Sequence, residues 1–191
     1  IRHLAALVAI GGALFAAFWF SGRFIRSYQK QRLIAFVHPE ADPKESGYHV
    51  IQARIAIGSG GLWGKGLFHS TQVRGGYIPE RQTDFIFTDI GEELGFTGAA
   101  TIALLYAGML WRGWNIIALS DEDRLGKLIA TGIVTMLAFH IVLNIGMNIG
   151  ILPVAGVPLP LISSGGSNVI LTLTCIGLLE SVCIRRHRLQ F

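Results

Sequence analysis

The sequence predicts an all-α polytopic membrane protein with four transmembrane helices and one large extracytoplasmic loop. Hydrophobic residues make up 51% of the 191 residues and charged residues only 15%, and the mean hydropathy is +0.52, which is typical of membrane proteins. Four segments nearly lack Asp, Glu, Lys and Arg, and each is close to the length that a helix needs to cross a hydrocarbon core of about 30 Å. Four such segments in one chain argue against buried core helices of a soluble protein. These spans are residues 4–21, 94–111, 128–150 and 168–184.

The first span, residues 4–21, is not expected to be a cleaved signal peptide. Arg2 is a thin basic flank, no small-residue cleavage site leads into a soluble domain, and three more hydrophobic segments follow. The chain begins with Ile1 rather than Met.

The distribution of Lys and Arg predicts the orientation. Basic residues gather around the short connector after the second span and in the tail, at Arg112, Arg124, Lys127, Arg185, Arg186 and Arg188. Short basic loops favour the cytoplasm, and with four spans both termini lie on the same side as that connector. The loop 22–93 should then be periplasmic or extracellular, because loops longer than about 60 residues do not follow the positive-inside count.

The cysteines and the net charge argue against a disulfide, a Cys-based metal site and a nucleic-acid partner. Cys175 and Cys183 both fall in the fourth span and lie about 12 Å apart along a helix, which is too far for a disulfide. The outer loop and the tail contain no Cys, so no Cys-based metal site is expected. The net charge of +4 is accounted for by the basic tail, and no nucleic-acid partner is expected.

The extracytoplasmic loop carries most of the motifs. Its first part, from Arg23 to Leu33, interleaves basic and apolar residues and fits either an amphipathic surface helix or a solvated end of the first span. A short helix is expected over Tyr48–Ile57. The glycine-rich run Gly58–Gly66 contains Lys65 and has backbone amides that could approach an anion, although a flexible loop is the plainer interpretation of this pattern alone.

Several ordered motifs of this loop together resemble the SEDS family (shape, elongation, division, sporulation) of cell-wall glycan polymerases. They are Ile55-Ala56-Ile57-Gly58-Ser59-Gly60-Gly61, Gly64-Lys65-Gly66, Tyr77-Ile78-Pro79-Glu80-Arg81-Gln82-Thr83-Asp84-Phe85-Ile86-Phe87 and Gly91-Glu92-Glu93-Leu94-Gly95. The elongation branch is more similar than the division branch. The resemblance covers about Tyr28 to Gly166 and departs at Gln82, where the family usually has His. It implies a ten-helix fold, of which these are the last four helices, in a bacterial cytoplasmic (inner) membrane.

The resemblance implies a peptidoglycan glycosyltransferase that polymerises lipid II, a disaccharide-pentapeptide on undecaprenyl pyrophosphate, during cell elongation and rod-shape maintenance. It also implies a class B penicillin-binding protein transpeptidase as partner within the rod-shape elongation complex. A lipid II flippase and a non-catalytic scaffold of the elongation machinery are the alternatives. A flippase would depend on polar residues within the spans, whereas a polymerase would depend on the outer loop.

Asp84 matches the position of the family's catalytic carboxylate. The resemblance gives it the role of general base, or of holder of an activating divalent cation, Mg or Mn, and implies no organic cofactor. Transfer from an α-linked donor to a β-linked strand implies inversion in one displacement. Positive charge should stabilise the departing pyrophosphate. The candidates for this contact are Arg81, Lys65, Arg54 and Arg74, with Glu80 as a second-rank site residue.

Two acidic residues at the end of the loop are interpreted mainly as structural. Glu92 and Glu93 lie where the loop meets the second span, and Asp89-Ile90-Gly91-Glu92 has the spacing of a helix capping box. Asp89 is therefore expected at the start of a helix.

Polar residues within the third and fourth spans are the remaining candidates. His140, Asn144 and Asn148 recur every four residues, so they share one face of a helix, and that face should contact protein. These side chains either form interhelical hydrogen bonds or line a path for a substrate or ion, and the sequence leaves both alternatives open. Glu180 is a lone acid that either pairs with Arg185 or Arg186 or marks a functional position.

The segment 151–167 is apolar but rich in Pro and Gly, which predicts an irregular or re-entrant extracytoplasmic loop. The orientation places it on the same side of the membrane as Asp84. Ser163 and Ser167 are candidates for contact with the sugar or lipid headgroup, and a purely structural turn is the alternative.

Overall fold

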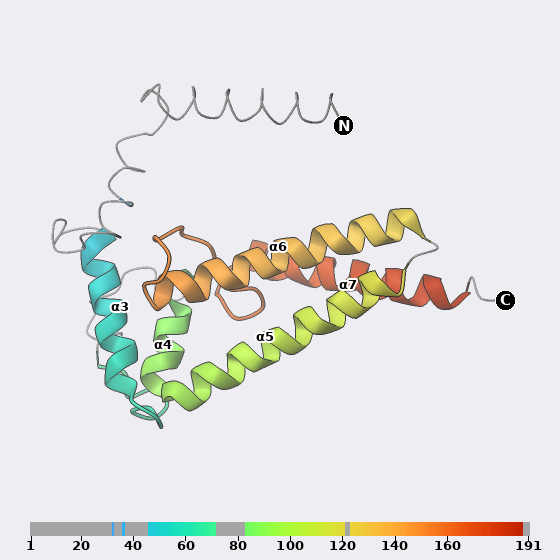
Figure 1. Cartoon of the computed structure of the whole chain (residues 1–191). Helices are drawn as coiled ribbons and strands as arrows, with labels where there is room; N and C mark the ends of the chain where they lie inside the picture. The colour runs from blue at the N-terminus through green and yellow to red at the C-terminus, as the bar shows by residue number, and fades with distance from the viewer. Residues whose placement is uncertain (1–31, 33–35, 37–45, 72–82, 121–122, 189–191) are drawn as a thin grey trace, which may run out of the picture.

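The fold is all helical wherever the structure describes it. This computed structural model describes residues 32, 36, 46–71, 83–120 and 123–188, and no strand occurs among them. Figure 1 shows the long helices running together along the molecule, with the shorter helices across one end. In chain order the helices are α3 (Ser46–Gly60), α4 (Ile86–Glu93), α5 (Gly95–Ala118), α6 (Arg124–Asn148) and α7 (Gly166–Arg188). The predicted all-α class is confirmed, and the predicted span 4–21 lies outside the described residues.

The three later spans are found as helices, but the helices are longer than the charge-free windows. Helix α5 continues seven residues past the predicted end at 111, and α6 begins at Arg124 rather than at 128. The membrane boundaries of these spans stay predictions. Arg112 and Arg124 are exposed side chains near the helix ends, where a long side chain can reach solvent while the backbone stays helical.

Two helices pass the simple test for a membrane span. Helix α6, with 25 residues, and residues Gly166–Arg185 of α7 are long and apolar enough to cross a membrane by length and composition. Helix α5 has 24 residues and packs beside α6. The four-span topology stays a prediction.

Local signals explain both ends of α6. Asp123 caps the start, because its carboxylate accepts a hydrogen bond from the Gly126 amide at 3.0 Å. The helix ends at Asn148, and Gly150 follows with φ of +76°, the left-handed conformation that glycine adopts without strain. Residues 151–165 then form no helix, which confirms the predicted irregular connection; its last two predicted residues belong to the first turn of α7.

The helix α4 corrects one prediction. It begins at Ile86, so Asp89 lies in its first turn and cannot serve as the expected cap. Phe85 occupies the capping position without a side-chain hydrogen bond to the helix. The predicted short helix at Tyr48–Ile57 is confirmed and is longer at both ends, as α3.

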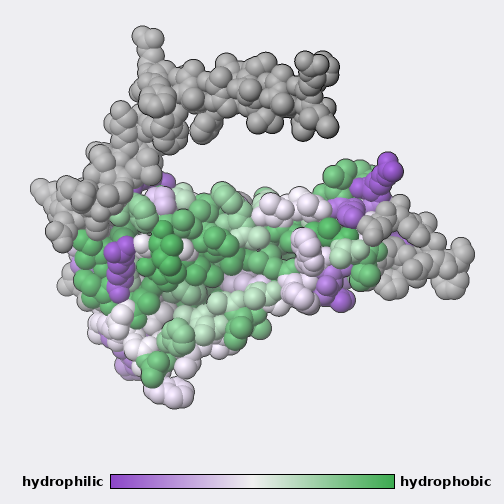
Figure 2. All heavy atoms as spheres, in the orientation of Figure 1, coloured by the Kyte–Doolittle hydropathy of each residue, from purple (hydrophilic) through white to green (hydrophobic). Residues whose placement is uncertain are grey.

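Apolar side chains form a buried cluster between the long helices and also cover much of the outer face. Side chains of α5, α6 and α7 form one buried cluster, which includes Ile116, Leu137 and Leu179. Figure 2 shows that the visible outer face is also largely apolar, with hydrophilic residues gathered toward the ends. Exposed Leu104 on α5 and Phe139 on α6 belong to this outer surface. Such a surface suits a lipid environment or further protein helices.

Candidate active site

Asp84 lies in the turn that leads into α4. The turn is anchored by its neighbour Phe85, which is buried against Ala53 and Ala56 of α3 and against Val154 of the connection between α6 and α7. The Asp84 side chain itself is half-buried. The sequence therefore places a large apolar residue directly after the acid, so that burial of one fixes the position of the other.

Distant polar side chains bind the backbone of this turn. The Asp84 carbonyl oxygen accepts hydrogen bonds from Nδ2 of Asn144 and from Nδ2 of Asn148, each at 3.0 Å. Ser163 donates its hydroxyl hydrogen to the Thr83 carbonyl, while the same hydroxyl oxygen accepts a hydrogen bond from the Leu159 amide at 2.7 Å. Helix α6 and the connection after it thus fix both carbonyls of the turn.

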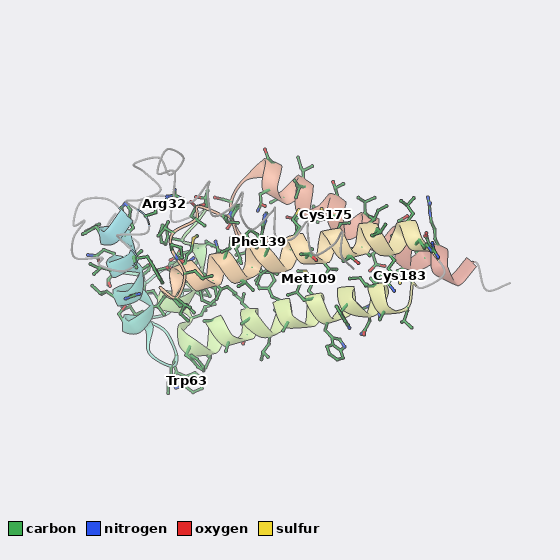
Figure 3. The ribbon with its side chains drawn as sticks, turned by 45° about the horizontal axis from the view of Figure 1, so that its top comes forward. Arg32, Trp63, Met109, Phe139, Cys175 and Cys183 are labelled. Carbon is green, nitrogen blue, oxygen red and sulfur yellow. The ribbon has the colours of Figure 1, made fainter. Side chains whose placement is uncertain are left out.

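The connection between α6 and α7 forms a wall beside the Asp84 carboxylate. At Gly156, with φ of +65°, a Cβ atom would lie 3.3 Å from Asp84 Oδ2 and 3.8 Å from Arg32 Nη2. Arg32 also donates to the Val154 carbonyl at 3.0 Å, and Figure 3 shows it beside this connection. Arg54 of α3 donates to the Gly150 carbonyl at 2.7 Å. One carboxylate oxygen and two guanidinium groups therefore gather along residues 150–156.

A second acid, Glu92, forms a different kind of site. Its side chain is 0% exposed, and its Oε1 atom lies 2.6 Å from Nζ of Lys65 in an ion pair. The same oxygen accepts hydrogen bonds from the amide and hydroxyl of Thr71, at 2.8 and 3.0 Å. Glu92 is thus satisfied by protein groups, and its predicted structural role is confirmed.

The glycine-rich run packs against the start of α5. The amides of Gly64, Lys65 and Gly66 donate to the carbonyls of Gly60, Glu92 and Glu93, at 2.8, 3.0 and 3.0 Å. A Cβ atom at Gly64 would lie 2.1 Å from the Glu93 carbonyl oxygen, so only glycine fits. The hypothesis that these amides bind an anion is wrong for these three residues, because each already has a backbone acceptor.

The sequence profile of the FTSW_RODA_SPOVE family, described as cell cycle protein, matches residues 1–188. The chain belongs to this family. It is the SEDS family that the loop motifs resemble.

Several named relatives are similar in sequence to this SEDS chain over most of its length. The chain is 44% identical over 189 residues to the peptidoglycan glycosyltransferase MrdB of Escherichia coli K12, covering 96% of this chain and 50% of the relative. It is 43% identical to the peptidoglycan glycosyltransferase RodA of Treponema pallidum, over 86% of this chain and 38% of the relative. Stage V sporulation protein E of Bacillus subtilis is 41% identical, over 92% of this chain and 50% of the relative. The chain thus spans about half the length of the curated relatives it matches, or less.

A solved structure also matches the fold of this SEDS chain. Its title is "Structural coordination of polymerization and crosslinking by a peptidoglycan synthase complex", and the match has a TM-score of 0.68 at 30% identity. It covers 100% of this chain and 50% of the matched chain. The described helices are therefore arranged as in one chain of that complex.

The predicted site residues of this SEDS chain have different outcomes. Asp84, Arg54 and Lys65 lie within the described residues, but Lys65 is paired with Glu92. Ser163 is 1% exposed, and its hydroxyl has two backbone partners, at Leu159 and Thr83, while its contact with the substrate stays a prediction. Ser167 is exposed in the first turn of α7, where its role stays a prediction. Arg74, Glu80 and Arg81 lie outside the described residues.

The polar residues of the spans are also placed. Asn144 and Asn148 are both 0% exposed, which confirms that this stripe faces protein, while His140 is half-buried. Glu180 is exposed on α7 and lines a cavity of about 130 Å³ together with Arg112. Its pairing with Arg185 or Arg186 stays a prediction.

A metal centre is not indicated by the described part of the chain. No group of three or more His, Cys, Asp or Glu side chains that could hold a metal ion occurs among the described residues. A divalent cation held through Asp84 remains a prediction.

Two contributors to the site were missed in the sequence. Gly156 and Arg32 lie near Asp84 although they are 72 and 52 positions away along the chain. Gly156 lies in a Pro- and Gly-rich segment whose other glycines look the same in sequence, and Arg32 is one of several basic residues in its stretch. No local sequence pattern distinguishes either residue. Only the folded structure shows that they lie near Asp84.

Proposed function

We propose that the protein is a peptidoglycan glycosyltransferase that polymerises lipid II into glycan strands during cell elongation, with Asp84 as its catalytic carboxylate. The observation that best supports this proposal is the way in which the fold holds Asp84. Its backbone is fixed by buried side chains, whereas its carboxylate is half-buried at the edge of a segment with two arginines. Two relatives from other bacteria are named as peptidoglycan glycosyltransferases.

The proposed reaction needs one base and a cation for the leaving group. The acceptor sugar hydroxyl oxygen attacks the anomeric carbon of the donor, and the Asp84 carboxylate takes the hydroxyl proton. The bond between that carbon and the pyrophosphate oxygen breaks, and undecaprenyl pyrophosphate leaves with the bonding electrons. Inversion at the anomeric carbon follows from this single displacement.

Arg54 and Arg32 are the described cations best placed to act on the leaving group. Both guanidinium groups donate to carbonyls of the connection that faces Asp84, at Gly150 and Val154. A guanidinium group has five N–H donors in a planar fork that suits phosphate oxygens. Arg74 and Arg81 remain candidates from the sequence.

We place the Asp84 turn on the extracytoplasmic side of a bacterial inner membrane. Arg124 and Asn144 are 20 residues apart on α6, about 30 Å at roughly 1.5 Å per residue, which matches the thickness of a bilayer core. The basic residues Arg124 and Lys127 are therefore at the opposite end of the helix from the Asp84 turn. That separation supports the positive-inside orientation, with termini in the cytoplasm and four spans.

We also propose a class B penicillin-binding protein as the partner, within the rod-shape elongation complex. The matched solved structure concerns a complex that couples polymerization with crosslinking. A polymerase that delivers uncrosslinked strands requires a transpeptidase to act on them.

The flippase alternative has less support than the polymerase. A transport path through the third span would need the polar stripe to face a cavity. Instead, the amide groups of Asn144 and Asn148 are buried and bound to the Asp84 and Val157 carbonyls. This stripe therefore supports the site turn.

The test is lipid II polymerisation by the full-length protein with its transpeptidase partner. Asp84→Asn keeps the shape of the side chain but removes the base, and we expect no glycan chains. Glu93→Gln is the matched control, since it neutralises another half-buried acid at the far end of α4 and should leave polymerisation intact. Wild-type chain formation by Asp84→Asn, with normal folding and partner binding, would refute the site and favour a flippase or scaffold.

A further inference from the structure

Two buried amide side chains bind one backbone oxygen at the site. Nδ2 of Asn144 and Nδ2 of Asn148 each lie 3.0 Å from the Asp84 carbonyl oxygen, and both residues are 0% exposed. A carbonyl oxygen has two lone pairs, so two such donors saturate it. Both partners of this carbonyl are thus side chains of α6, so the position of the Asp84 backbone depends on that helix.

The orientation of both amides is fixed by their other partners. Oδ1 of Asn148 accepts from the amide and hydroxyl of Thr88, at 3.2 and 2.5 Å, and a backbone amide can only donate. Nδ2 of Asn148 must therefore face Asp84. Nδ2 of Asn144 contacts two carbonyls, those of Asp84 and Val157, and carbonyls can only accept.

The same amide of Asn144 also fixes the wall opposite the carboxylate. Its second hydrogen bond, to the Val157 carbonyl, is 2.7 Å long. Val157 follows Gly156, at which a Cβ atom would lie 3.3 Å from Asp84 Oδ2. One NH2 group thus joins the backbone of Asp84 to the segment that its carboxylate faces.

We propose that Asn144 and Asn148, oriented by Thr88, are positioning residues that set where the Asp84 carboxylate lies relative to the bound sugars. This inference rests on the proposed function, because it matters for the rate only if Asp84 takes part in the reaction. A displacement of a reacting group by about 1 Å can lower a rate by about a hundredfold. Removal of either amide should therefore lower kcat and leave KM for lipid II nearly unchanged.

Thr88 offers a matched pair of substitutions that separates positioning from packing. Thr88→Val has nearly the same shape but lacks the hydroxyl that donates the shorter of the two hydrogen bonds to Asn148 Oδ1, whereas Thr88→Ser keeps the hydroxyl and loses a buried methyl group. Positioning predicts that Thr88→Val lowers kcat by about tenfold or more, within the range of small displacements, and that Thr88→Ser keeps most of it. Packing alone predicts the reverse order.

The experiment measures kcat and KM for lipid II on the full-length protein with its partner, below the onset of thermal unfolding. Asn144→Ala, Asn148→Ala and the two Thr88 variants are compared with Ser120→Ala. Ser120 is also buried and hydrogen-bonded, to the Ile116 carbonyl, but lies at the other end of α5. Ser120→Ala should keep its kcat even if its unfolding midpoint falls.

The outcomes separate this inference from the proposed function. If Asp84→Asn is inactive while Asn144→Ala and Thr88→Val keep the wild-type kcat, the positioning role is refuted and the function stands. If Thr88→Ser loses as much as Thr88→Val, packing explains the network and the positioning role is again refuted. If Asp84→Asn itself polymerises normally, the proposed function fails first.

Discussion

Glu92 and Asp84 lie eight residues apart in one short segment, and the fold treats them in opposite ways. The Glu92 carboxylate is fully buried, pairs with Lys65 at 2.6 Å and accepts two hydrogen bonds from Thr71. The Asp84 carboxylate is half-buried, and it is the backbone carbonyl of Asp84 that buried amides bind. In one case the protein buries the charge and pairs it with Lys65; in the other, buried amides hold the backbone and the carboxylate stays half-buried beside Gly156.

The difference is the one expected between a structural acid and the proposed catalytic acid. An ionised carboxylate is costly to bury unless it is paired and hydrogen-bonded, so Glu92 stabilises only the conformation in which Lys65 and Thr71 meet it. A general base needs a carboxylate that a substrate can reach in a fixed position. Holding Asp84 through its carbonyl satisfies both conditions, because the restraint does not occupy the carboxylate oxygens.

The largest effect on stability is expected at the buried pair. Lys65→Met leaves the Glu92 charge buried without its cation, and we expect a loss of about 3 kcal/mol, the lower end for broken buried pairs, because Lys65 keeps 25% of its side-chain surface exposed. Thermal unfolding of the solubilised protein measures this as a lower midpoint. Polymerisation per folded molecule should stay near wild type.

The double variant Lys65→Met with Glu92→Leu sharpens this prediction. Replacing both charges by apolar groups is often close to neutral, so much of the lost stability should return. The contrary result would be a large rise in KM for lipid II in Lys65→Met at unchanged stability. Lys65 would then contact the pyrophosphate, as the sequence alone predicts, and the contrast between Glu92 and Asp84 would no longer hold.

Hydropathy was sufficient to predict the long helices but not their ends. Helices α5, α6 and α7 contain the long charge-free windows, since a run of apolar residues has few alternatives to a buried or membrane-facing helix. The windows ended at Arg112 and began after Lys127, whereas the helices include both residues. A long charged side chain can reach solvent from within a helix near its end, so charge alone does not locate a helix end.

The site itself was predictable only in part. The four-residue spacing of Asn144 and Asn148 correctly predicted a protein-facing stripe, because periodicity reports which residues share a face. It could not report that the stripe binds the carbonyl of a residue 60 positions earlier. The Lys65–Glu92 pair, 27 residues apart, was equally invisible, and Lys65 was therefore interpreted as a substrate contact.

A smaller effect is expected at Gly156, where stability and activity should separate. Its φ of +65° is left-handed, so Gly156→Ala should cost about 1–2 kcal/mol in backbone strain. The new methyl group would also lie 3.3 Å from Asp84 Oδ2, and we expect polymerisation to fall further than the folded fraction.

Gly61 provides the matched control for that strain. It has φ of +58°, and a Cβ atom there would meet nothing within 4 Å. Gly61→Ala should therefore lower the unfolding midpoint about as much as Gly156→Ala and leave the rate per folded molecule unchanged. Equal rates in the two variants would argue that the wall at Gly156 does not constrain the Asp84 carboxylate.

The smallest effect on stability is expected at Arg54. Its guanidinium is exposed and donates one hydrogen bond to the Gly150 carbonyl, so Arg54→Met should cost about 1 kcal/mol or less. Arg112→Met, at an exposed arginine near the far end of α5, is the control for loss of one charge. If Arg54 contacts the departing pyrophosphate, Arg54→Met alone lowers kcat/KM, because the leaving group then lacks a cation. Equal kcat/KM in the two variants would confine Arg54 to the support of Gly150, and Arg32 would then be the described cation left beside Asp84.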